Sequence, residues 1–161
     1  MTILSIDPAE HCGFAIGSTG FGLLDSGMWF LGPTKRKKKG EAKEPDGKKL
    51  VRLTEHLADL WGIHNYDTVV YETPAFGTYP LALISHAKFI AVIEACCETN
   101  GWAYRGYAPT QIKKFACGSG NAKKADMLRV ARDRFLVDKT DVSDDEADAV
   151  ALLHLALRDA G

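Results

Sequence analysis

Two β-rich segments that each end in an acid, with a helical segment between them, constrain the fold of this chain most strongly. Residues 2–7 read Thr-Ile-Leu-Ser-Ile-Asp before Pro8, and residues 67–72 read Asp-Thr-Val-Val-Tyr-Glu. Apolar residues recur at helical spacing over residues 50–63. Because a strand–helix–strand unit makes a right-handed crossover, the two strands are expected to be parallel. Asp7 and Glu72 should then lie at the same edge of one sheet, where α/β proteins place their chemistry.

The rest of the chain predicts an α/β fold with a mixed five-stranded sheet flanked by helices. Short turns join the first strand to strands at residues 11–17 and 21–31, which favours a three-strand antiparallel meander. A fifth strand is expected at 102–107, and further helices at 81–99, 109–115, 123–135 and 143–155. With 161 residues, 46% of them hydrophobic, the chain is long enough for one domain, 1–161, with a substantial core.

Composition excludes several other classes of protein. The formal net charge is −1, so global charge neither requires nor excludes a polyanionic partner. We find no signal-peptide pattern and expect no apolar run of membrane length, which favours a cytoplasmic protein that is not attached to a membrane. The four cysteines show no C-x-x-C spacing, so we expect buried thiols rather than a zinc site.

A run of positive charge follows the predicted meander. Residues 35–49 hold eight basic and three acidic residues, an excess of five positive charges. Such a segment cannot build a core, so we expect a flexible basic loop at about residues 33–49. It is either a solvated loop with no partner or an arm that binds phosphates, Lys37 and Lys38 among its cations.

The last predicted helix opens with a dense group of acids. Ser143 and Glu146 have the spacing of a capping box, and acids in a first helical turn are favoured by the helix dipole. That structural reason covers Asp145 but not Asp148, which lies a turn further in and on the same face as Asp145. These two carboxylates continue the core-facing stripe, so they should point at the edge of the sheet.

Bringing Asp7, Glu72, Asp145 and Asp148 together needs an outside reason, because mutual repulsion raises the pKa of each acid and destabilises the site. A divalent cation supplies that reason, and oxygen ligands without cysteine or histidine favour Mg²⁺ or Mn²⁺. Two such ions, about 4 Å apart, suit the cleavage of a phosphodiester. The acids therefore predict a metal-dependent phosphoryl-transfer site.

The sequence resembles the RuvC-type Holliday-junction resolvases, which have the RNase H-like fold, over nearly its whole length. The matching segments are Ile6-Asp7-Pro8 with Gly13, Tyr71-Glu72, and the acidic helix at 145–151. Between them, residues 107–114 (Tyr-Ala-Pro-Thr-Gln-Ile-Lys-Lys) and 118–124 (Gly-Ser-Gly-Asn-Ala-Lys-Lys) are similar to the basic segment of that family.

The resemblance implies that the four acids hold two Mg²⁺ ions, which Mn²⁺ can replace. It also implies that Lys113 and Lys124 contact the strand phosphates, with Lys114 beside them. After Glu72, Phe76 is the first candidate for an aromatic that stacks on an opened base step, and Tyr79 the second; either could instead pack under the loop. The implied substrate is a four-way DNA junction, cut symmetrically by a homodimer to leave 5′-phosphate ends. We place the dimer interface on the apolar helix at 81–99.

Two other functions remain open on the sequence alone. One is a nuclease with a broader choice of branched DNA, such as forks and flaps, which the basic insertion would suit. The other is a non-catalytic protein that binds junctions, which the presence of all four acids disfavours. A sugar-kinase or actin-like arrangement is disfavoured because the chain has no second repeat of the fold.

Overall fold

The computed structural model of the chain describes residues 1–161 except 34–39, 41, 43, 76, 78 and 137–138. Its centre is a five-stranded sheet in the order β3-β2-β1-β4-β5. The strands are β1 (Thr2–Asp7), β2 (His11–Ser18), β3 (Gly22–Phe30), β4 (Thr68–Glu72) and β5 (Ala103–Tyr107). β1 pairs antiparallel with β2 and parallel with β4, which confirms the predicted mixed sheet.

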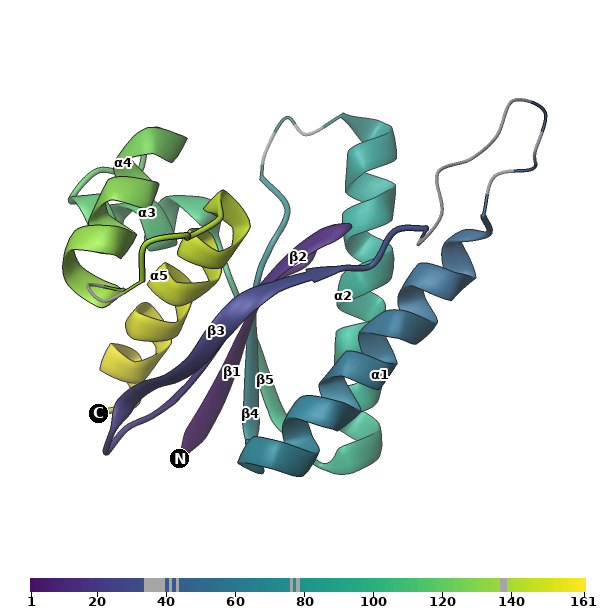
Figure 1. The fold of residues 1–161 in the computed structure, drawn as a ribbon, viewed down its shortest axis with the longest axis horizontal. Coiled ribbons are helices and arrows are strands. Elements are labelled where there is room, and N and C mark those ends of the chain that lie inside the picture. The colour runs from purple at the N-terminus through teal and green to yellow at the C-terminus, as the bar shows by residue number, and fades with distance from the viewer. Residues whose placement is uncertain (34–39, 41, 43, 76, 78, 137–138) are drawn as a thin grey trace.

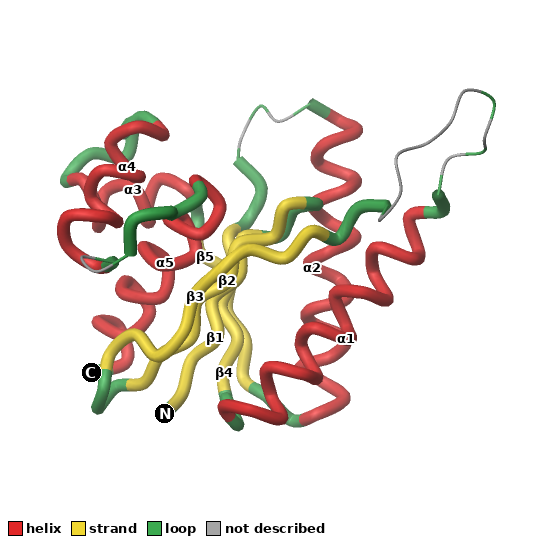
Figure 2. The backbone as a smooth tube through the Cα atoms, in the orientation of Figure 1, coloured by secondary structure: helices red, strands yellow, loops and turns green. Residues whose placement is uncertain are grey.

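Helices cover both faces of this sheet (Figures 1 and 2). One face carries α1 (Asp46–His64) and α2 (Pro80–Asn100). The other carries α3 (Pro109–Cys117), α4 (Lys124–Val130), the π-helix η1 (Ala131–Phe135) and α5 (Asp144–Ala160). The prediction of one helix over 123–135 was wrong in its second half, where the backbone widens into the π-helix. α1 begins at Asp46, four residues before the predicted start. The prediction began too late because the first turn of the helix is polar and lies outside the apolar periodicity.

Alternation along the strands sorts the core into two halves. Ile3, Ala15 and Val70 pack with α5 and its neighbours. The residues that alternate with them along the strands, such as Leu4 and Ile6, point to the opposite face and pack with α1 and α2. We call the side of the sheet that Ile3, Ala15 and Val70 share the α5 face. Asp7 and Glu72 lie on the same face, because each is two residues beyond a residue on it, Ser5 and Val70.

Two features bring α5 unusually close to the sheet. Gly13 on β2 faces the first turn of α5, where an added Cβ would lie 1.9 Å from the carbonyl oxygen of Asp145. Further down, the buried Ser5 hydroxyl lies 2.7 Å from the carbonyl oxygen of Ala149 and 3.0 Å from that of Ala15. The missing side chain and the buried hydroxyl together fix the depth and register of the helix on β1 and β2.

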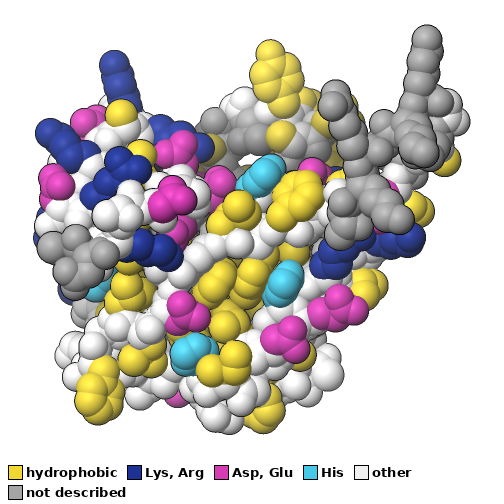
Figure 3. All heavy atoms as spheres, in the orientation of Figure 1, with side chains coloured by type: hydrophobic (Ala, Val, Ile, Leu, Met, Phe, Trp, Pro, Cys, Tyr) yellow, Lys and Arg dark blue, Asp and Glu magenta, His cyan; other side chains and the backbone are white. Residues whose placement is uncertain are grey.

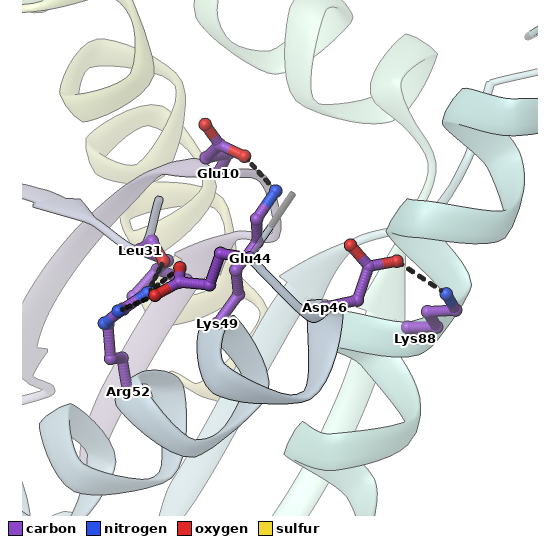
Figure 4. Close-up of polar contacts among 7 residues, drawn as sticks. All are labelled: Glu10, Leu31, Glu44, Asp46, Lys49, Arg52 and Lys88. Carbon is purple, nitrogen blue, oxygen red and sulfur yellow. Dashed lines mark hydrogen bonds and ion pairs between the residues drawn. The ribbon is translucent and has the colours of Figure 1, made fainter. Parts of the chain in front are cut away.

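Leu31, which precedes the basic segment 35–49, and residues of the second half of that segment are held at the edge of the sheet (Figure 4). Arg52 of α1 donates to the carbonyl of Leu31 at 2.9 Å and pairs with both carboxylate oxygens of Glu44 at 2.7 and 2.8 Å. Lys49 pairs with Glu10 in the β1–β2 turn. Lys37 and Lys38, the cations singled out in this segment, lie outside the described residues.

α2 is apolar on most of its surface and is buried only at Phe89, Ile93 and Cys97. By length and composition it is the one helix in the described part of the chain that could span a membrane, which the sequence analysis did not anticipate. Polar contacts nevertheless join it to the rest of the fold, since Tyr71 of β4 donates to Glu94 and Lys88 pairs with Asp46 of α1.

Replacing Gly13 by alanine is expected to lower the free energy of unfolding by about 1–3 kcal/mol, because the new methyl group displaces the α5 backbone. Chemical denaturation measures this change. Gly62→Ala is the matched control: nothing lies within 4 Å of its added Cβ, so removing a helical glycine should stabilise the protein by about 0.5–1 kcal/mol. Equal effects of the two substitutions would contradict the close contact.

Candidate active site

Acids from three elements gather at the carboxyl ends of β1 and β4. Asp7 is the last residue of β1 and Glu72 the last of β4, and both lie on the α5 face. Asp145 and Asp148 come from the first two turns of α5. Gly13, which pairs with Asp7, is also the residue against which the Asp145 backbone packs. The fold thus brings the four acids singled out from the sequence to one rim of the sheet.

The electrostatics of this rim are those of carboxylates crowded together and shielded from water. Burial raises the pKa of Asp7 to about 7, with a further rise from the charges of Asp148 and Asp145. Burial also raises the pKa of Glu72 to about 8, helped by the charges of Asp7 and Asp148. The pKa of Asp148 rises to about 6, chiefly through burial. Such perturbed acids in one cluster are typical of functional sites.

Two lysines from α3 and the start of α4 border the acids. A pocket of about 190 Å³ is lined by Glu72, Asp148, Lys113 and Lys124, with Pro109, Ile112 and Met127 as its apolar wall. The Lys113 charge lowers the pKa of Glu72 against the larger effect of burial, and Lys124 does the same for Asp7. The pocket therefore carries both signs of charge.

Lys114 points elsewhere. It lines a separate, larger hollow of about 460 Å³ between α3 and α5, together with Phe115 and Arg158. This hollow does not include any of the four acids, so its size does not make it the catalytic centre. Three lysines were singled out between residues 107 and 124. The structure brings Lys113 and Lys124 to the acids and leaves Lys114 on another surface.

Glu146 corrects the predicted capping box. Ser143 does cap α5, accepting from the Glu146 amide at 3.1 Å. The Glu146 side chain, however, is buried and turned toward β3, where it accepts from Ser26 at 2.6 Å and from Lys139 at 2.5 Å. Its carboxylate therefore fastens α5 to β3 and faces away from the acids. Asp144 is paired with Lys124 at 3.3 Å.

The acids present suit a hard divalent cation. Among the described residues, no three carboxylate, imidazole or thiol groups converge tightly enough to form a ready-made cation site. The donor chemistry still fits Mg²⁺, because burial and neighbouring carboxylates raise the pKa of Asp7, Glu72 and Asp148, and a cation would relieve both penalties. Asp7, Glu72, Asp145 and Asp148 are the residues that would hold it.

The β4–α2 connection carries one contact that sequence reasoning missed. His86 Nε2 of α2 donates to the carbonyl of Glu72, 2.9 Å away, and so ties α2 to the end of β4. Nothing in the spacing of His86 along the sequence indicates this contact. Of the two aromatic residues singled out here, Tyr79 is exposed just before α2, and Phe76 lies outside the described residues.

The mixed sheet, with acids from β1, β4 and α5 at one rim, defines an RNase H-like nuclease fold. The sequence model of the family described as Crossover junction endodeoxyribonuclease RuvC matches residues 3–155. A relative of that description from Petrotoga mobilis is 30% identical over 156 residues, covering 94% of this chain and 90% of its own. One from Erythrobacter litoralis is 28% identical, covering 92% and 90%. The chain belongs to the RuvC family.

Solved structures agree on the fold. Thermus thermophilus RuvC superposes with a TM-score of 0.76 at 18% identity, covering 99% of this chain and 96% of that one. The same protein in complex with a Holliday junction substrate gives 0.77 at 16% identity, covering 99% and 95%. The yeast mitochondrial Holliday junction resolvase gives 0.65 at 13% identity, covering 97% and 77%.

The raised pKa values predict how stability depends on pH in the absence of divalent cations. Between the unfolded pKa values of 3.8 and 4.5 and the folded values of about 6 to 8, the folded chain keeps protons that the unfolded chain has lost. The free energy of unfolding should therefore fall as the pH rises from about 4 to about 8. Thermal unfolding in EDTA across this range measures the slope.

The double variant Asp7→Asn/Glu72→Gln should flatten this slope, because it removes two of the groups that take up protons on folding. Asp59→Asn, at an exposed position of α1, is the matched control and should leave the slope unchanged. A double variant that unfolds with the same pH dependence as the parent would show that Asp7 and Glu72 do not have raised pKa values in the folded protein.

Proposed function

We propose that this protein is a metal-dependent endonuclease that resolves four-way DNA junctions through paired, symmetric cuts. The observation that carries the proposal is the gathering at one rim of acids from three separate elements, where burial first and neighbouring carboxylates second raise the pKa of Asp7, Glu72 and Asp148. Buried acids that repel one another destabilise the folded protein, so stability alone does not explain their presence at one rim. Membership of the RuvC family supports DNA junctions as the substrate.

In this proposal the four acids hold two Mg²⁺ ions, for which Mn²⁺ can substitute. When bound, the ions supply Lewis acidity toward the scissile phosphodiester. Lys113 and Lys124 hold the phosphates on either side of it, since their ammonium groups line the same pocket as Glu72 and Asp148. The products carry 5′-phosphate and 3′-hydroxyl ends. The protein acts on DNA in the cytoplasm, as one domain, 1–161.

Cleavage of a labelled immobile four-way junction tests the proposal. The wild-type protein should make paired nicks in Mg²⁺ and none in EDTA. Asp7→Asn should slow cleavage by at least about 100-fold while junction binding persists, because it removes one metal-binding carboxylate but no DNA contact. Asp59→Asn should cut like the wild type. Junction binding without cleavage, in Mg²⁺ or Mn²⁺, would instead indicate a non-catalytic junction-binding protein.

A second candidate function is a nuclease that cuts forks and flaps as well as junctions. The excess of five positive charges over residues 35–49 supports it, because binding through phosphates is independent of sequence and tolerant of DNA shape. Cleavage rates on four-way junctions, replication forks and linear duplex, compared at one salt concentration, separate the two. Similar rates on forks and junctions would favour the broader nuclease.

We also propose that the protein is a homodimer joined through α2. Its side chains Leu81 and Ile84 are 83% and 52% exposed, and the helix is apolar on the side away from the sheet. Such a surface is typical of subunit contacts, and a two-fold dimer would present two sites to the two matching strands of a junction.

Sedimentation at micromolar concentration should give a dimer for the wild-type protein and a monomer for Ile84→Glu, because a charge would be buried in the interface. Ile63→Glu is the control, since Ile63 is 70% exposed at the end of α1, away from α2's outer surface. A monomeric wild-type protein would exclude the dimer, and a dimeric Ile84→Glu would place the interface elsewhere.

A further inference from the structure

An exposed aromatic pair lies next to the acids and has no role in the site described so far. His11, at the start of β2, pairs with Phe30, at the end of β3, and their ring centroids are 5.0 Å apart. Phe30 is 45% exposed and His11 is exposed, although rings of this size usually gain from burial. The same end of β3 exposes Met28, which pairs with Gly13.

The pair lies on the same face of the sheet as the acids. His11 is two residues from Gly13, so both are on the α5 face, and Phe30 is there because it pairs directly with His11. Gly13 in turn pairs with Asp7. At about 3.3 Å per residue, the rings lie roughly 7 Å beyond Asp7 along the strand direction. His11 is also one strand and Phe30 two strands away from β1, so the rings lie roughly 8 and 12 Å from Asp7, about two to three nucleotides of a stacked DNA strand.

The local backbone is shaped around the Phe30 ring. A Cβ on Gly32 would lie 2.5 Å from Cζ of Phe30 and 2.6 Å from Oε1 of Glu10, so only glycine lets the ring lie in this position. Figure 3 shows hydrophobic side chains running along β3 on this surface, with lysines and arginines gathered over the α3 and α4 helices beside them. The ring is therefore held by its surroundings while part of it stays open.

The ion pairs beside the two rings leave little net charge there. Glu10, the acid nearest the ring, is paired with Lys49 and so presents little net negative charge. On the other side, Lys139 donates to the carbonyl of Ser26, four residues back along β3, at 3.1 Å, and its charge is offset by Glu146. In the sequence, five successive basic residues, 35–39, follow shortly after Phe30. Exposed aromatic rings are the groups on which single-strand binding proteins stack bases.

We propose that His11 and Phe30 form a stacking site for a nucleobase of the substrate strand, about two to three nucleotides from the phosphodiester held at Asp7. The site lies across Asp7 from the β4–α2 connection, so it contacts the strand on the other side of the cut from that connection. The base it takes is one unstacked at the branch point, and stacking makes it tolerant of sequence. This inference rests on the proposed function, because the same DNA strand must reach both places.

The test uses the full-length Asp7→Asn protein, which should bind the junction without cutting it. A four-way junction carries 2-aminopurine at single positions within about three nucleotides of the scissile bond on either side. Binding should change the fluorescence at one position on one side. Phe30→Leu keeps an apolar side chain but removes the ring, so it should abolish that change and raise the Kd by about fivefold or more. His11→Ala should act in the same direction.

Phe21→Leu is the matched control, because Phe21 is 88% exposed in the turn at the opposite end of β3. It should leave both the Kd and the fluorescence unchanged. Thermal unfolding checks that Phe30→Leu is folded, and Gly32→Ala, which displaces the ring without removing it, should reproduce the loss. If folded Phe30→Leu binds like Phe21→Leu, the stacking site is wrong and the proposed function stands. If Asp7→Asn does not bind the junction at all, both fail.

Discussion

The depth at which α5 lies on the sheet is the constraint on which the rest of the structure depends. The helix is buried along most of its length, so its position is decided by packing against β1 and β2 rather than by the acids at its start. Gly13 permits the approach and the buried hydroxyl of Ser5 sets the register, at 2.7 Å from the Ala149 carbonyl. The hydrophobic core thus provides the force that holds four mutually repelling carboxylates together.

This arrangement separates two tasks on one short stretch of helix. Asp145 and Asp148 share one face and meet the strand ends, whereas Glu146 between them is rotated toward β3 and bonded to Ser26 and Lys139. A residue in a helix is turned by about 100° from its neighbour, so three acids in four positions can serve two different surfaces. The group that fastens the helix to β3 and the groups that join the acidic rim are therefore distinct.

Much of this could be predicted from the sequence, because strand ends and helical spacing are local properties. Two strands that end in Asp7 and Glu72, with a helix between them, sufficed to place both acids on one edge. Features that depend on contacts between distant residues could not be found in this way. The spacing of Ser143 and Glu146 fits a capping box whichever way the Glu146 side chain turns. The aromatic pair of His11 and Phe30 likewise exists only because β2 and β3 are in one particular register.

The anchoring of the basic segment has a consequence for how such proteins can diversify. Arg52 binds the Leu31 carbonyl before the segment and the Glu44 carboxylate in its second half, so the chain is fixed to α1 at both of these points (Figure 4). The entropy cost of closing a loop grows only slowly with its length, by roughly 0.6 kcal/mol for each doubling. Insertions between these anchors can therefore add or remove positive charge at small cost to folding. The charge of this segment can therefore vary over evolution while the sheet and its acids remain the same.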